Sequence, residues 1–146
     1  MLPAFDAFGN LPRGIHPATW QEIVDRFGTN DHRRRLLDGL RAALVSLKGA
    51  GCRTVYLNGS FVTAKGHPAD FDGCWDLEDV RVEAVDLVLL VMDEGRSAQK
   101  SKYLGELIPA WFHPGGRGQA LLDVFQTDRD GRPKGLVELN VQDDDL

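Results

Sequence analysis

One sequence feature constrains the fold of this chain most. It is a short apolar segment that leads into a Gly-Ser pair and is followed soon after by a pair of aspartates. The apolar segment is Val55 to Leu57, the pair is Gly59-Ser60, and nine residues further on comes Asp70-Phe71-Asp72. Side chains alternate between the two faces of a strand, so the two carboxylates of an Asp-x-Asp strand point to the same face. The spacing predicts a strand, a tight turn and a second strand that presents two acids together.

These residue types are those of a site for a metal ion and a phosphate. Mg²⁺, like Mn²⁺, takes oxygen ligands, and Mg²⁺ usually keeps waters and substrate phosphates in its remaining positions. Glycine lets the backbone approach a phosphate closely, and exposed N–H groups and a serine hydroxyl can donate to its oxygens. We therefore expect Asp70 and Asp72 to hold Mg²⁺ or Mn²⁺, and Gly59 and Ser60 to hold the phosphates of a nucleoside triphosphate (NTP).

In this order, the two motifs resemble the signature of the nucleotidyltransferase superfamily, which includes DNA polymerase beta and the aminoglycoside nucleotidyltransferases. The resemblance implies an α/β (α+β) fold in which helices cover a mixed β-sheet, in a single domain over residues 1–146. In that pattern the residue after the second aspartate is generally hydrophobic, and here it is Gly73. This glycine indicates a bend in the strand or a close approach to it. Further segments resemble a group of small uncharacterised bacterial nucleotidyltransferase-like proteins: 57–63, 70–76, 125–128 and 133–135.

The superfamily chemistry also needs a third carboxylate on a neighbouring strand. Asp123 and Asp86 both lie among apolar residues. We favour Asp123, because in related enzymes the third acid comes from a strand well downstream of the pair; Glu138 in the last expected strand is a further alternative. The expected site is then catalytic and metal-binding Asp70, Asp72 and Asp123, with phosphate-binding Gly59 and Ser60.

The resemblance implies the transfer of a nucleoside monophosphate from an NTP such as ATP to an acceptor, with release of pyrophosphate. We expect a macromolecular acceptor, an RNA or a partner protein, because the chain is too short for the extra helical domain that holds acceptors in related enzymes. Such proteins often form one half of a toxin–antitoxin or phage-defence pair. Two alternatives stay open: an inactive binding module of the same fold, acting as an antitoxin or regulatory partner, and a small-molecule nucleotidyltransferase.

The remaining sequence predicts a helical region followed by a sheet. Thr19 and Glu22 form a capping box for a helix from Trp20 to Phe27, and Asn30 caps a longer helix that ends near Gly51. The other expected elements are an irregular arm at 1–17, strands at 54–57, 70–75, 85–92, 119–126 and 135–141, a helix at 97–107, and a hairpin connection at 127–134.

Composition and net charge limit the kinds of binding partner that we expect. The net charge of −5 argues against general adhesion to nucleic acid or to an anionic membrane, so extended DNA is not expected as a substrate. Two cysteines without metal-ligand spacing, and no leader-like start, indicate a reduced, cytoplasmic protein. Among single residues, we expect Trp75 in the core and the Arg33-Arg34-Arg35 run on a solvated helix surface. We also expect Arg96, Lys100 and Lys102 on a solvated helix face, with phosphate contact as the alternative.

Overall fold

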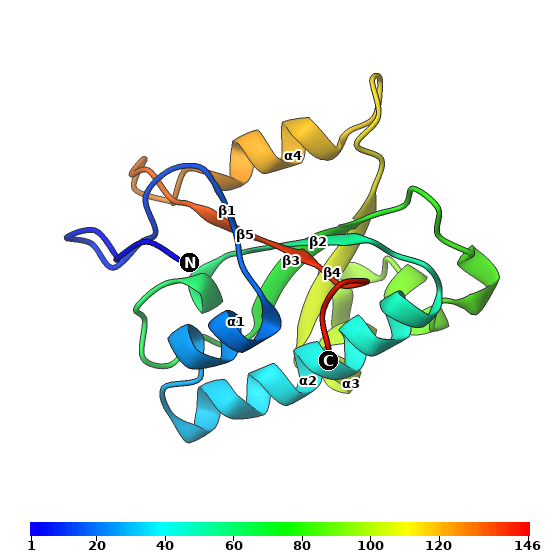
Figure 1. Ribbon diagram of the computed structural model, residues 1–146, viewed down its shortest axis with the longest axis horizontal. Helices are drawn as coiled ribbons and strands as arrows, with labels where there is room; N and C mark the ends of the chain where they lie inside the picture. The colour runs from blue at the N-terminus through cyan, green and yellow to red at the C-terminus, as the bar shows by residue number, and fades with distance from the viewer.

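A five-stranded mixed sheet lies at the centre of the computed structural model, which describes residues 1–146 (Figure 1). The strand order is β1-β5-β2-β3-β4. Strand β2 runs antiparallel to both of its neighbours, whereas β1 with β5 and β3 with β4 are parallel pairs. The strands are β1 (Ile15–Pro17), β2 (Thr54–Asn58), β3 (Phe71–Asp76), β4 (Gly105–Ala110) and β5 (Leu136–Asn140).

Helices cover the two faces of the sheet unequally. Helices α1 (Trp20–Phe27) and α2 (Asp31–Gly49) lie on one face, and α4 (Gly118–Phe125) lies on the other (Figure 1). The main core, 25 buried residues, fills the space under α1 and α2, whereas only three buried residues form the cluster under α4. The shorter elements are α3 (Ser97–Tyr103) and the 3₁₀ turns η1 (Ser60–Val62), η2 (Val82–Ala84), η3 (Leu87–Leu90) and η4 (Glu94–Arg96).

The two N-terminal helices begin at the caps that the sequence predicts. The Thr19 hydroxyl accepts from the Glu22 amide and the Glu22 carboxylate accepts from the Thr19 amide, which completes the capping box of α1. The Asn30 side chain accepts from the amide of Arg33 at the start of α2. Neither helix, nor any other in the structure, is long and apolar enough to cross a membrane.

Strand β3 lies between β2 and β4 and positions the motif. Asp72 pairs in register with Asn58 on one side and with Glu106 on the other. A Cβ on Gly73 would meet the Tyr56 backbone and would lie 2.9 Å from Leu107 Cδ2. The expectation of a close approach at Gly73 is therefore confirmed, and Trp75 is fully buried in the core as expected.

Four of the expected elements differ in the structure: two differ in type, one in length and one in what it connects. Residues 119–126 do not form a strand but the helix α4, because Leu122 and Phe125 at three-residue spacing pack against the sheet. Residues 85–92 contain the turn η3 (Leu87–Leu90) instead of a buried strand, and Leu87 is 74% exposed. The helix expected at 97–107 ends at Tyr103, where Leu104 adopts a left-handed conformation (φ 71°) and β4 begins. The connection at 127–134 keeps its turn, with an isolated bridge from Thr127 to Pro133, but joins a helix to a strand.

Two smaller expectations also change. The N-terminal arm is irregular except at Ile15–Pro17, which pairs with β5 as the strand β1. Arg33 is not on a solvated surface: it is 2% exposed, and its guanidinium donates to the carbonyls of Phe61, Thr63 and Lys65. This arginine ties α2 to the loop that follows Gly59.

Candidate functional site

The Gly-Ser turn lies directly against the second aspartate of the motif. Gly59 follows β2 with a φ of 75°, a conformation that favours glycine, and Ser60 begins the turn η1. A Cβ at Gly59 would collide with the Asp72 carboxylate and lie 3.1 Å from its Cγ. The bare glycine backbone is therefore what lets the turn and the carboxylate share one space.

A second carboxylate stands beside Asp72 on the next strand. Glu106 is its partner in the parallel β3–β4 register, so both side chains lie on the same face of the sheet, the face that α4 covers. Glu106 is close enough to Asp72 to raise the pKa of the Asp72 carboxyl group. Asp70, just before β3, is close enough for its charge to act on Asp72.

The electrostatics of Asp72 follow from this crowding. Burial raises the pKa of Asp72 to about 7, and the negative charges of Asp70 and Glu106 add to the rise, while Lys100 opposes it. The negative charges that keep Asp72 partly protonated near neutral pH also attract cations to this place. A pKa displaced by burial and by a named charge partner is also a physical mark of a functional site.

Basic side chains already contact the outer two acids. Lys100 Nζ lies 3.6 Å from Asp70 Oδ2, and Arg96 Nε lies 3.9 Å from Glu106 Oε2. These two cations, which the sequence suggests as phosphate contacts, are thus paired with the acids of the motif. Lys102, the third of that group, pairs with Asp86 instead.

A polar cleft opens in front of Gly59, Ser60 and Asp72. Its volume is about 420 Å³, which suits a small ligand, and no hydrophobic side chain lines it. Lys65, Arg129 and Lys134 bring positive charge to its wall, and burial lowers the pKa of Lys134. The remaining lining residues are Asn10, Thr63, Asp128 and Asp130.

The donor atoms of this site fit Mg²⁺ in kind and in number. As the side chains stand, no group of three or more His, Cys, Asp or Glu is arranged to hold a metal ion. Mg²⁺, however, is usually held by one or two carboxylates with substrate phosphates in other positions. The Asp72–Glu106 pair supplies two such carboxylates beside the polar cleft, and a divalent cation would offset the negative charges of Asp70 and Glu106, which add to the rise in the pKa of Asp72.

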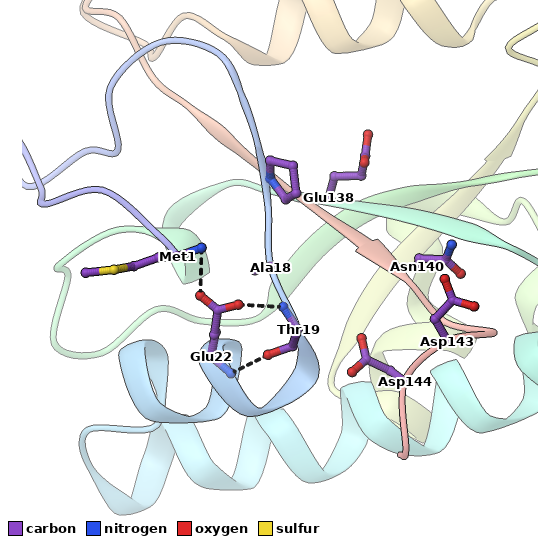
Figure 2. Close-up of a pocket in the computed structure, with 9 residues that line it drawn as sticks. Met1, Ala18, Thr19, Glu22, Glu138, Asn140, Asp143 and Asp144 are labelled. Carbon is purple, nitrogen blue, oxygen red and sulfur yellow. Dashed lines mark hydrogen bonds and ion pairs between the residues drawn. The ribbon is translucent and has the colours of Figure 1, made fainter.

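The structure does not bring the three candidates for the third acid to Asp72. Asp123 is exposed on α4 and accepts from Gln119; its choice depended on a strand at 119–126, which is a helix. Asp86 caps η3 and is held by Lys102 and Tyr103. Figure 2 shows Glu138 in a different pocket, with Met1, Glu22, Asp143 and Asp144.

The comparison with protein families matches residues 3–140 to a family of unknown function, DUF6932. The chain belongs to this family. The match spans β1 to β5 and so includes every residue of the site described above. Comparisons with curated proteins and with solved structures found no match.

The residues that sequence reasoning missed in this DUF6932 chain are Glu106, Lys65 and Arg129. Glu106 stands directly before Leu107-Ile108, which is the apolar context expected of a third acid. The run of helix-favouring residues before it, Ser97 to Tyr103, hid the start of the strand. Gly105 was the available signal, because a glycine after a helix and before an apolar run marks a change of element.

Proposed function

We propose that this chain is a metal-dependent nucleotidyltransferase that moves a nucleoside monophosphate from an NTP to an acceptor supplied from outside the chain. One observation carries the proposal: the Gly59 turn lies against Asp72, and Glu106 stands beside Asp72 on the neighbouring strand. A strand, a Gly-Ser turn and acids on two adjacent strands are what the resemblance to the superfamily implies. On this proposal the mixed sheet is a nucleotidyltransferase-type sheet.

The chain's own residues would divide the work between the phosphates and the acceptor. Ser60, Lys65 and Lys134 would hold the triphosphate in the polar cleft. A carboxylate oxygen of Glu106 would accept the proton of the acceptor hydroxyl. The hydroxyl oxygen then bonds to the α-phosphorus, the bond from that phosphorus to the oxygen bridging to the β-phosphate breaks, and pyrophosphate leaves.

Asp70 and Asp72 would hold the metal, together with Glu106. Bound Mg²⁺ would neutralise the charge that develops on the triphosphate as the bond breaks. The Lys100–Asp70 and Arg96–Glu106 pairs would have to loosen when the site fills. At separations of 3.6 and 3.9 Å with part-exposed partners, both are weak enough to do so.

Calorimetric titration with ATP and Mg²⁺ tests the site. We expect Asp72→Asn and Glu106→Gln each to weaken ATP binding by at least about tenfold, since even residues that only support metal ligands cost 10–100-fold. Asp123→Asn is the matched control: it removes the same charge from exposed α4, and we expect wild-type affinity. Equal affinity in all four proteins, or loss in Asp123→Asn alone, would reject the assignment.

A second candidate is a binding module that keeps the fold without turnover. The observation that favours it is the pairing of Asp70 with Lys100 and of Glu106 with Arg96, which leaves no preformed three-ligand metal site. Incubation with labelled NTP, Mg²⁺ and cell extract separates the two candidates. The enzyme labels an RNA or protein band that Asp70→Ala abolishes, whereas the binding module labels nothing yet still retains a partner.

A further inference from the structure

A second cavity lies on the same sheet face as Glu106. Side chains two residues apart on a strand share a face and stand about 6.6 Å from one another. Glu106, Ile108 and Ala110 therefore follow one another along the α4 side of β4, and the latter two line this cavity. We call it the Trp111 pocket, with a volume of about 530 Å³; Arg96, Trp111, His113 and Arg117 also line it.

The pocket combines an open aromatic surface with positive charge. Trp111 is 46% exposed, and the His113 ring lies with its centroid 5.2 Å from the indole. Arg96 and Arg117 line the same space, and no acidic residue does. The charged side chains of this pocket are therefore positive, whereas the chain as a whole has a net charge of −5. Aromatic rings beside guanidinium groups are the chemistry with which proteins hold unpaired bases and their phosphates.

Arg96 connects the pocket to the motif. Its guanidinium lines the pocket and also faces Glu106, at 3.9 Å from Nε to the carboxylate. That Nε is buried and has no hydrogen-bond partner. A buried donor without a partner is costly, so the Arg96 side chain gains if it turns its guanidinium toward an acceptor atom of a ligand. A ligand in the Trp111 pocket would thus contact Arg96 and place its next atoms beside Glu106.

We propose that the Trp111 pocket binds the acceptor of the transfer reaction and that this acceptor is a nucleotide unit, either free or at the end of a single-stranded RNA. Its base stacks on Trp111, its phosphate contacts Arg117, and its hydroxyl meets Glu106. The inference rests on the proposed nucleotidyltransferase function. A volume of about 530 Å³ suits one nucleotide, and the absence of acids in the wall suits a phosphate. In Figure 1 the loop after β4, which carries Trp111, projects beyond the sheet, where a longer strand of RNA can pass.

Fluorescence anisotropy with a labelled single-stranded RNA hexamer tests the pocket without NTP or metal. We expect Trp111→Ala to weaken binding by about tenfold, which is the usual effect of removing a stacking ring, and Trp111→Phe to restore most of it. Arg117→Gln should lower the slope of log affinity against log salt by about 0.7, the value for one phosphate contact on a single strand. Arg35→Gln, an exposed arginine on the opposite face of the sheet, should change neither quantity.

Competition with adenosine monophosphate identifies the source of the nucleotide. If the monophosphate displaces the hexamer at equal concentration, the acceptor is a free nucleotide; if it needs a large excess, the acceptor is an RNA end. No RNA or monophosphate binding, or equal affinity in wild type and Trp111→Ala, would overturn the proposal. Melting curves establish that the variants are folded, which we expect because Trp111 lies at the surface.

The two proposals fail separately. If RNA binding depends on Trp111 but not on Asp72, and the protein does not bind ATP, the RNA-binding pocket stands and the proposed reaction is rejected. If ATP binding depends on Asp72 but Trp111→Ala leaves the RNA affinity unchanged, the proposed reaction stands and the proposal for the pocket is rejected.

Discussion

In the folded protein, the surroundings of Asp72 disfavour the charged form of its carboxyl group, which a bound cation would favour. An unfolded aspartate loses its proton near pH 3.9, whereas Asp72 in the folded protein holds its proton up to about pH 7 because it is buried beside Asp70 and Glu106. Between these two pH values the folded state binds more protons than the unfolded state. The free energy of unfolding therefore falls as the pH rises through this window.

This linkage predicts that Asp72→Asn stabilises the metal-free protein. At pH 8 we expect the melting temperature to rise by about 3 °C or more, since each kcal/mol moves Tm by roughly 3–4 °C in a domain of this size. Below pH 4 the gain should vanish, because the aspartate is then protonated in both states. Thermal melts in chelator across this pH range measure both expectations. Asp123→Asn, on an exposed helix face, should show no such pH dependence; a Tm gain for Asp72→Asn that is the same at pH 4 and pH 8 would contradict the account.

At the scale of elements, one side chain fixes the motif loop to the long helix. The Arg33 guanidinium on α2 donates to three carbonyls of the loop after Gly59, at 2.8 Å for Phe61, 2.7 Å for Thr63 and 3.0 Å from Nε to Lys65. It also reaches the Phe27 carbonyl at the end of α1. Because a planar guanidinium presents its donors in a fixed fork, one residue satisfies carbonyls from two separate segments.

Arg33→Ala should therefore destabilise the protein by about 2–4 kcal/mol, since it leaves several buried carbonyls without donors. Urea denaturation measures this loss. Arg34→Ala is the matched control on the next residue: its partner Asp31 is a surface carboxylate 3.3 Å away, so the cost should stay below about 0.5 kcal/mol. Arg33→Lys should recover only part of the loss, because an ammonium cannot reproduce the fork. Equal costs for the two alanine variants would refute this role of Arg33.

The whole molecule is built asymmetrically about its sheet. Under α1 and α2 lies a core of 25 buried residues, and under α4 lies a cluster of only Cys74, Leu122 and Leu136. The thin layer leaves room on the α4 face for both the acids of the motif and the Trp111 pocket. A face with few apolar contacts opens more readily than a thick core.

Two buried leucines on opposite faces test this asymmetry. Leu44 on α2 is fully buried and Leu122 on α4 is 1% exposed, so burial alone predicts equal losses. We expect Leu44→Ala to cost about 2–5 kcal/mol and Leu122→Ala about half as much, because the thin layer can collapse around the change. In native-state hydrogen exchange, α4 amides should exchange faster than those of α2. Equal protection in the two helices would show that both faces unfold as one unit.

Much of the local structure could be predicted because its causes lie within a few residues. The capping box at Thr19 and the apolar stripe of α2 act at spacings of three and four residues. The Gly59 turn against Asp72 depends on one glycine and one strand pair. Each of these signals survives without knowledge of what the segment packs against.

The third acid and the two faces could not be predicted in this way. Residues 119–126 are apolar enough for a strand or a helix. They form the helix α4, whose apolar side packs on the face of β2, β3 and β5. Glu106 became the neighbour of Asp72 only because β4 joined β3 in parallel, a pairing between segments 34 positions apart in register. The sequence alone determined the Gly59 turn and the caps and apolar stripes of α1 and α2, whereas the tertiary structure decided which carboxylates meet, because meeting depends on strand order and register that no local pattern encodes.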